Sequence, residues 1–206
     1  MTKYFFIYLL FFANFSKSQF FENHSIYLSY GPSIGNYAGS HIGVNYIYKE
    51  KFTFLASSSL LSRRSTTCPD DFDGGLSVNV LWLEMGAPSE FFRSNYLMAG
   101  YVKPINLRKT IRLNFKVGIA STKIIEPTNY VKIIGPYPYQ NYTYDLYESK
   151  PISFVLSAGI EFPFYRGFGF AVEPYLFIND KRVATGISLH LIFGMLRGKT
   201  IPKVEK

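Results

Sequence analysis

The stretch that decides the fold is KTIRLNFKVGIASTKIIEPTNY, Lys109 to Tyr130, in which large apolar residues alternate with small or polar ones. A period of two residues indicates a β-strand with two unlike faces. The apolar face carries Ile111, Leu113, Phe115, Val117 and Ile119, and the opposite face carries Arg112, Asn114, Lys116, Gly118 and Ala120. The pattern predicts a strand and poses a question: whether its apolar face points into a core or outward to lipid.

The same alternation recurs along the chain and predicts eight strands of nine to fifteen residues. They are longer than the usual strand of a globular protein and close to the length of a tilted membrane-spanning strand. The expected strands are Ser25–Ile34, His41–Lys49, Lys51–Ser62, Ser94–Pro104, Thr110–Thr122, Pro151–Pro163, Gly167–Ile178 and Arg182–Leu196. A ninth strand at Leu76–Ala87 is an alternative. It would put the two termini at opposite ends of the barrel, so we favour a loop there.

Shorter and longer connections alternate between these strands, with a slight break in the pattern at the last one. Short ones are expected at Lys49–Lys51, Asn106–Lys109, Tyr165–Gly167 and Asn179–Arg182, a moderate one at Gly31–Ser40, and long ones at Arg63–Arg93 and Lys123–Lys150. Short turns at one end and longer loops at the other are typical of outer-membrane barrels, whereas such long loops are unusual in a compact soluble domain. The prediction is an all-β fold: an eight-stranded antiparallel up-and-down transmembrane β-barrel with two long outer loops. In it, Pro127 ends the ladder of the fifth strand.

Side-chain volume predicts which face points into the barrel. An eight-stranded barrel has an interior just wide enough to be filled by side chains, so it accommodates the small polar face better than the large apolar one. Charged residues on that face would be buried in the lumen and would need partners there. We expect a lumen polar network of Arg112, Lys116, Glu161, Glu173 and His190. The alternatives are a soluble β-sandwich with an aromatic core and a lipocalin-like soluble barrel.

The start of the chain has the layout of a secretory signal peptide: Lys3, an apolar run from Tyr4 to Phe15, and small residues before Gln19. We expect a signal peptide at residues 1–18, an outer-membrane barrel domain at 19–196 and a polar tail at 197–206. Of the 206 residues, 48% are hydrophobic and 17% are charged, and the net charge is +8. Export argues against nucleic acid as the partner of this basic chain. The expected location is the cell outer membrane, and the expected partner is outer-membrane lipid.

The sequence contains no motif that indicates a cofactor, a metal site or an enzyme. It has no nucleophile elbow, phosphate loop or HExxH motif, and its single cysteine, Cys68, excludes an internal disulfide. Some small barrels are lipid-modifying enzymes, so a catalytic alternative pairs His41 or His190 with a serine such as Ser157 or Ser188. A histidine in a polar lumen is more often a hydrogen-bonded filler, which is the interpretation that we favour.

Four stretches carry a resemblance to a known family. They are PDDFDGG (Pro69–Gly75), KTIRLNFKVGIASTKIIEPTNY (Lys109–Tyr130), SAGIEFPFYRGFGFAVEPYLFIND (Ser157–Asp180) and GISLHLIFGMLRGK (Gly186–Lys199). Through them the chain resembles the outer-membrane β-barrel proteins of bacteroidete-type Gram-negative bacteria, a large and mostly uncharacterised group. The resemblance implies a barrel and its location, and no established activity. Many such barrels end on an aromatic residue, whereas RGKTIPKVEK follows Leu196, so the insertion signal is expected to be internal, at Phe193.

The expected function is structural or interactive, through two polar stretches outside the barrel. The Tyr-rich NYTYDLYESK (Asn141–Lys150) suits an adaptable contact surface. PDDFDG (Pro69–Gly74) gathers three carboxylates but lacks the spacing of a calcium loop. The interaction candidates, for a protein or another surface ligand, are Asp70, Asp71, Asp73, Tyr142, Tyr144 and Tyr147. The alternative function is a small pore or an accessory subunit of a transport or secretion machine.

Overall fold

The structure, a computed structural model, describes residues 23–73, 88–106, 110–135 and 141–196. The expected signal peptide, the expected tail and the segment Leu76–Ala87 lie outside these ranges. The described strands are β1 (His24–Gly35), β2 (Ala38–Tyr48), β3 (Phe52–Arg64), β4 (Ser89–Pro104), β5 (Arg112–Lys132), β6 (Tyr142–Ser149), β7 (Ile152–Phe162), β8 (Phe168–Ile178) and β9 (Val183–Met195). Within the same ranges, no helix is long and apolar enough to cross a membrane.

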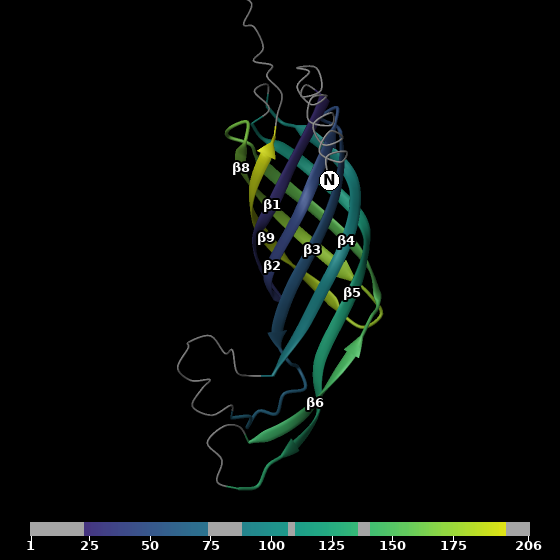
Figure 1. Ribbon diagram of the computed structural model, residues 1–206, viewed down its shortest axis with the longest axis vertical. Coiled ribbons are helices and arrows are strands. Elements are labelled where there is room, and N and C mark those ends of the chain that lie inside the picture. The colour runs from purple at the N-terminus through teal and green to yellow at the C-terminus, as the bar shows by residue number, and fades with distance from the viewer. Residues whose placement is uncertain (1–22, 74–87, 107–109, 136–140, 197–206) are drawn as a thin grey trace, which may run out of the picture.

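Eight of these strands close into an antiparallel barrel (Figure 1). The sheet runs β4-β3-β2-β1-β9-β8-β7-β5, and β4 also pairs with β5, which completes the circle. The predicted closed eight-stranded antiparallel barrel is therefore confirmed. Because the circle is complete, the barrel itself has no open sheet edge. β6 lies outside the circle and pairs with β5.

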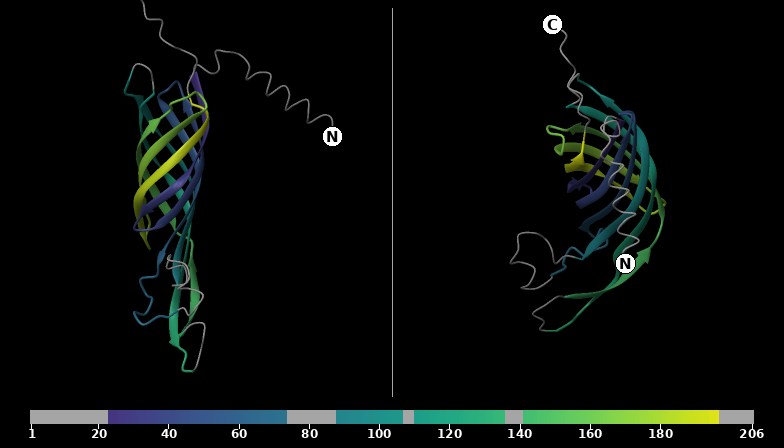
Figure 2. Two further views of the ribbon diagram at one scale, coloured as in Figure 1. Left: turned by 90° about the vertical axis from the view of Figure 1, so that its left-hand side faces the viewer. Right: turned by 45° about the horizontal axis from the view of Figure 1, so that its top comes forward.

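The two ends of the barrel are built differently. At one end, which we call the turn end, β1 begins, β9 ends and Lys49–Lys51 joins β2 to β3. That turn is tight: Lys49 and Glu50 have φ values of 51° and 56°, as in a type I′ hairpin. At the opposite end, which we call the hairpin end, β5 and β6 project far beyond the other strands (Figures 1 and 2).

The prediction of a long loop at Lys123–Lys150 is wrong for most of that range. β5 continues through this region to Lys132 and is 21 residues long. β6 then returns along it, with Ile124 opposite Ser149 and Lys132 opposite Tyr142. The long connection is therefore largely a β-hairpin that extends one wall of the barrel.

Pro127 lies within the ladder and does not end it, contrary to the prediction. It is opposite Leu146 of β6, and its carbonyl oxygen accepts a hydrogen bond from Thr67 Oγ1 at 2.9 Å, on the side away from β6. A proline is tolerated in a strand where its missing N–H points away from the ladder. The ladder between β5 and β6 thus loses no hydrogen bond at this position.

The connection predicted at Gly31–Ser40 is shorter than expected. β1 runs to Gly35 and β2 begins at Ala38, so only Asn36 and Tyr37 form the turn. Asn36 is fixed by the neighbouring strand, because its side-chain amide donates to the carbonyl oxygen of Val183 at 2.7 Å. The moderate loop expected here is a two-residue turn.

The alternation along β5 separates the inside of the barrel from its outside. Arg112 and Lys116 are 2% and 1% exposed, whereas Phe115 and Ile119 are 54% and 64% exposed. Large apolar side chains of the other strands are exposed in the same way, among them Leu28, Ile42, Phe54, Leu97, Phe154, Phe170 and Leu189. The apolar face therefore points outward.

Candidate functional site

Inside the barrel near the turn end, one carboxylate gathers three donors. Glu161 on β7 forms an ion pair with Arg112 on β5, with 2.7 Å between Oε2 and Nη2, and both side chains are buried. The hydroxyl of Tyr27 and the amide of Asn114 donate to Oε1 of Glu161 at 2.5 and 2.7 Å. Arg112 Nη1 also donates to the carbonyl oxygen of Leu196 at 2.8 Å. The register brings the ion pair together, because Arg112 and Glu161 are opposite each other on neighbouring strands.

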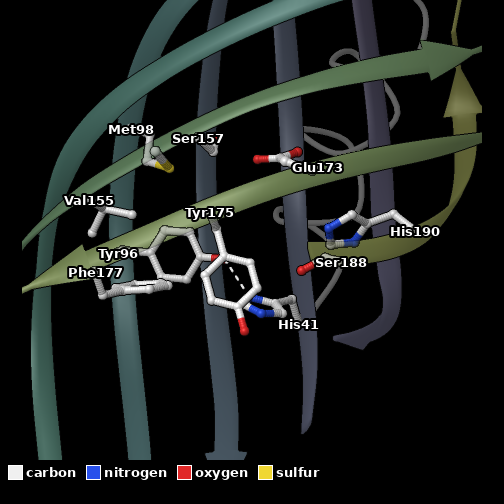
Figure 3. A pocket seen from close by; sticks show the side chains of 10 residues that line it. All are labelled: His41, Tyr96, Met98, Val155, Ser157, Glu173, Tyr175, Phe177, Ser188 and His190. Carbon is white, nitrogen blue, oxygen red and sulfur yellow. Dashed lines mark hydrogen bonds between the residues drawn. The ribbon is translucent and has the colours of Figure 1, made fainter. Parts of the chain in front are cut away.

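A second ion pair lies deeper in the lumen. Lys116 on β5 is 2.8 Å from Glu173 on β8, measured from Nζ to Oε2. β7 separates these two strands, so the pair bridges across it, over Ser157, which is opposite Lys116. His190 on β9 is buried and lies in the same part of the lumen as Glu173 (Figure 3). The structure thus places all the predicted lumen residues inside the barrel, in two neighbouring groups.

A small cavity lies beside the second ion pair (Figure 3). Its volume is about 10 Å³. His41 and His190 line it with their ring centroids 6.0 Å apart, and the hydroxyl of Tyr96 lies 3.0 Å from His41 Nδ1. The serines of the catalytic alternative, Ser157 and Ser188, line it too. A volume of this size holds about one water molecule, so this histidine pair has no room for a substrate.

A further polar cluster, at the hairpin end of the lumen, was not predicted. Glu90 on β4 accepts hydrogen bonds from Arg63 at 2.8 Å, from Arg182 at 3.0 Å and from the hydroxyl of Tyr37 at 2.5 Å. Arg182 also pairs with Glu126 at 2.5 Å. The sequence carried no alternation that signals this cluster, because two adjacent apolar residues and then three polar ones follow Glu90 in EFFRSN. An earlier start for that strand would have placed Glu90 on the inward face.

Packed rings fill the lumen between the polar groups. The largest cluster of buried side chains consists of Tyr37, Leu55, Leu61, Phe92, Tyr96, Met98, Ala120, Ile124, Val155, Tyr175, Phe177 and Ala184. Phe177 lies at its centre, with ring centroids 5.7 Å from Phe92 and 5.2 Å from Tyr96. The expectation that the inner face is only small or polar is therefore wrong for this part of the barrel. The interior is nevertheless filled, as expected for eight strands.

Outside the barrel, the loop after β3 packs against the β5–β6 hairpin. Asp71 accepts hydrogen bonds from Lys132 Nζ at 2.6 Å and from the hydroxyl of Tyr142 at 2.7 Å. These bonds, that from Lys132 first, hold the pKa of Asp71 below its ordinary value, so the carboxylate is charged at neutral pH. Phe72 stacks on Tyr142 with 6.2 Å between ring centroids. Two stretches far apart in sequence thus meet in one surface.

The other interaction candidates occupy different positions on this surface. The backbone N–H of Asp73 donates to Asn141 Oδ1 at 2.7 Å, which holds the same loop against the hairpin. Asp70 is exposed in the turn just before Asp71. Tyr144 and Tyr147 are exposed on β6 itself, and not in a loop as predicted.

Within the part of the chain that the structure describes, β6 is an edge strand whose side chains are exposed on both faces. All residues from Thr143 to Glu148 are exposed, and β5 is the only described strand that pairs with β6. Because the carbonyl group of Pro127 points away from β6, Pro127 and Leu146 form a non-hydrogen-bonded pair. Leu146 therefore directs its own N–H and C=O to the open edge.

Metal-binding groups are not assembled in the described ranges, where no three His, Cys, Asp or Glu side chains are placed to hold an ion. Cys68 is a half-buried free thiol in the loop after β3, and its Sγ donates to the carbonyl oxygen of Pro69 at 3.6 Å. The described residues thus present two features for function: a filled polar lumen and an exposed hairpin.

Comparisons with known proteins support the fold and assign no family. No protein-family model matches the chain, and no curated protein matches it. A similar solved structure is the crystal structure of Ail, the attachment invasion locus protein of Yersinia pestis. The TM-score is 0.50 at 15% sequence identity, over 84% of this chain and 98% of that chain.

Two further structures of Ail give similar values. Its complex with the heparin analogue sucrose octasulfate has a TM-score of 0.49 at 16% identity, and its backbone structure in a phospholipid bilayer nanodisc has 0.47 at 17% identity. Each covers 84% of this chain and 98% of the Ail chain. The resemblance to bacteroidete-type barrel proteins stays a prediction. What the likeness to the Ail crystal structure establishes is the fold: a closed eight-stranded antiparallel β-barrel.

Proposed function

We propose that this chain is an integral outer-membrane β-barrel with a filled lumen, which binds a protein partner at its β5–β6 hairpin. The observation that carries the proposal is the distribution of side chains, with ion pairs inside the barrel and apolar residues outside. Leu97, Ile119 and Leu189, on three different strands, are 66%, 64% and 58% exposed. In water such a band would be an aggregation or interaction surface. Against hydrocarbon it is the ordinary outer face of a barrel.

The orientation in the membrane follows from the two ends. Barrels of this kind place their short turns in the periplasm and their longer connections outside the cell. Aromatic rings gather at the turn end, where the ring centroid of Phe168 is 5.1 Å from those of Phe170 and Phe193. Aromatic belts of this kind lie at the membrane surface. The hairpin end is therefore assigned to the cell exterior, which agrees with the expected signal peptide.

The open edge of β6 is the feature that suits a protein partner. An extended segment of another protein can add to such an edge as a further strand, held by backbone hydrogen bonds. Leu146 supplies an N–H and a C=O directed to that edge. Exposed side chains of Tyr144, Leu146 and Tyr147 provide apolar contact area beside them. The contact of Asp71 with Lys132 and Tyr142 braces the far end of the hairpin.

Photo-cross-linking from the hairpin in intact cells tests this binding mode. We expect a benzophenone amino acid at position 144 to form a covalent adduct with a protein. Adding Leu146→Pro is expected to reduce the adduct about tenfold, because one backbone hydrogen bond to the partner and its donor are lost. The ladder with β5 stays intact in this variant, since the N–H of Leu146 faces away from it.

Leu146→Ala is the matched control for that experiment, because it removes the side chain and keeps the N–H. It is expected to retain most of the adduct. Equal adduct formation with Leu146→Pro would show that β6 does not bind through its edge. Absence of any protein adduct in the parent would remove the partner-binding part of the proposal and leave the membrane barrel to be judged by heat-modifiable gel mobility.

The filled lumen makes a prediction that separates this proposal from a small pore. The purified barrel in a planar bilayer is expected to show no steady ion current, because packed rings fill the lumen and the cavity beside the central ion pair has a volume of about 10 Å³. Tyr96→Ala combined with Phe177→Ala removes two rings from the centre of the lumen and is expected to produce measurable current. Steady current through the unaltered protein would favour the pore or transport-accessory function instead.

A further inference from the structure

A hollow lies in the apolar outer face of the barrel. It is a groove of about 480 Å³ across β4, β5, β7 and β8, within the roughly 300–1,000 Å³ usual for small-molecule sites. Its lining consists of Tyr101, Lys103, Leu113, Asn114, Phe115, Ala158, Gly159, Ile160, Val172 and Pro174. Apart from Lys103 and Asn114 the lining is apolar or aromatic, and Asn114 directs its amide inward to Glu161.

Small residues on β7 and β8 create the hollow. Ala158 is the small member of an outward row that otherwise carries Phe154, Leu156 and Ile160. The residue beside it on β8 is Pro174, which lacks an N–H, and no ladder pair forms at this position although the register is the same on both sides. The floor of the groove is therefore low, because only small side chains project from it.

Larger side chains form the walls on either side of this floor. Phe115 is opposite Ala158 on β5, and Tyr101 is opposite Phe115 on β4. On the other flank, Ile160 is opposite Val172. All four side chains are exposed on the outside of the barrel. A flexible hydrocarbon chain can lie between such walls with more contact than on the convex surface elsewhere.

A lysine stands at the end of the groove nearest the turn end. Lys103 is the last outward residue of β4 before Pro104, and it is exposed. Among the described residues, no carboxylate forms an ion pair with it. Lys51 lies alongside, because its carbonyl oxygen accepts a hydrogen bond from the N–H of Val102 at 2.6 Å. The groove thus leads from an apolar hollow to Lys103, with Lys51 on the neighbouring turn, at the level where a membrane surface would be.

We infer that this groove binds one anionic phospholipid, with an acyl chain against Ala158 and Pro174 and the phosphate beside Lys103. The inference rests on the proposed membrane location. It fits a lipid better than a second copy of the chain, because a narrow groove with a cation at its interfacial end matches the shape and charge of a phospholipid. Basic side chains at a membrane surface attract anionic head groups, and the long stem of Lys103 lets its ammonium reach them.

Native mass spectrometry of the detergent-purified barrel tests the site. The probe is an equimolar mixture of phosphatidylglycerol and phosphatidylcholine with identical acyl chains. We expect the protein to retain one lipid, with phosphatidylglycerol preferred about fivefold. Ala158→Phe fills the groove and is expected to abolish retention. Ala56→Phe, on the outward face of β3 away from the groove, is the matched control and is expected to leave retention unchanged.

The charge at Lys103 is tested separately. Lys103→Gln is expected to keep the lipid and lose most of the preference for phosphatidylglycerol, and Lys103→Arg is expected to restore it. Three results would each overturn the site. They are unchanged lipid retention in Ala158→Phe, an unchanged preference for phosphatidylglycerol in Lys103→Gln, and a protein dimer in place of the lipid adduct. Heat-modifiable gel mobility of every variant distinguishes this outcome from failure of the proposed function. If the barrel folds in vesicles but binds no lipid selectively, only the proposed lipid site is rejected. If the chain does not fold in vesicles, both the lipid site and the proposed membrane function are rejected.

Discussion

Replacing Glu161 with leucine is expected to lower the free energy of unfolding by about 3–5 kcal/mol. The substitution leaves the Arg112 guanidinium buried without the carboxylate that lies 2.7 Å away. It also removes the acceptor of the Tyr27 hydroxyl and of the Asn114 amide. A buried charge without a partner is among the most destabilising single changes in a protein interior, because its lost hydration is no longer compensated.

Urea titration of the vesicle-embedded barrel, followed by gel mobility, measures this loss. The double variant Arg112→Leu with Glu161→Leu is expected to recover much of it, because no unpaired charge remains, and the double-mutant cycle isolates the coupling. Glu148→Leu is the matched control. It removes a carboxylate that pairs with Lys123 at 2.5 Å on the exposed hairpin, where such pairs contribute about 0–1 kcal/mol. A similar small loss for Glu161→Leu would mean that the lumen is hydrated and the ion pair is not structural.

Replacing Val117 with arginine is expected to cost about 2–4 kcal/mol, the penalty for a cation on the lipid-facing side near the bilayer midplane. Val117 is an outward residue of β5, and it is opposite Leu156 near the middle of β7. Phe52→Arg is the control at the start of β3, at the turn end, where the cost is expected to be about 0–1 kcal/mol. Both positions are exposed in the isolated barrel.

Unfolding in vesicles and in detergent-free buffer distinguishes the possible results. A depth-dependent penalty, large for Val117→Arg and small for Phe52→Arg, identifies hydrocarbon outside the barrel. A soluble barrel would tolerate both substitutions, and it would remain in solution without detergent. That result would contradict the membrane proposal while leaving the strand topology unchanged.

The barrel wall was predictable because two independent regularities agree. Strict alternation, as in Ile111 to Ile119, indicates strands, and the limited interior of eight strands indicates which face points inward. The hairpin was not predictable by the same reasoning. Pro127 is a strong local signal for a strand end, and only the direction of its missing N–H, away from Leu146, makes it compatible with the ladder. That direction depends on the partner strand, which the local sequence does not specify.

The candidate site also has a part that was predictable from the sequence and a part that was not. Residues such as Arg112 and Glu161 were accessible to sequence reasoning because they share an inward face at neighbouring positions of the ladder. The cluster around Glu90 was missed because its strand begins five residues earlier than expected, at Ser89 and not Ser94. The groove beside Lys103 also could not be foreseen, since it depends on the register that sets Ala158 opposite Phe115 and beside Pro174.

The unbroken course of β5 has a mechanical consequence. One continuous strand forms both the barrel wall and the projecting hairpin. A pull on a partner held at β6 would pass into β5 and load its ladders with β4 and β7 in shear, along their whole length. Many backbone hydrogen bonds would then resist together and would not be peeled apart one by one. If the proposed partner binds there, a barrel built in this way would transmit tension to its wall without unfolding the element that makes the contact.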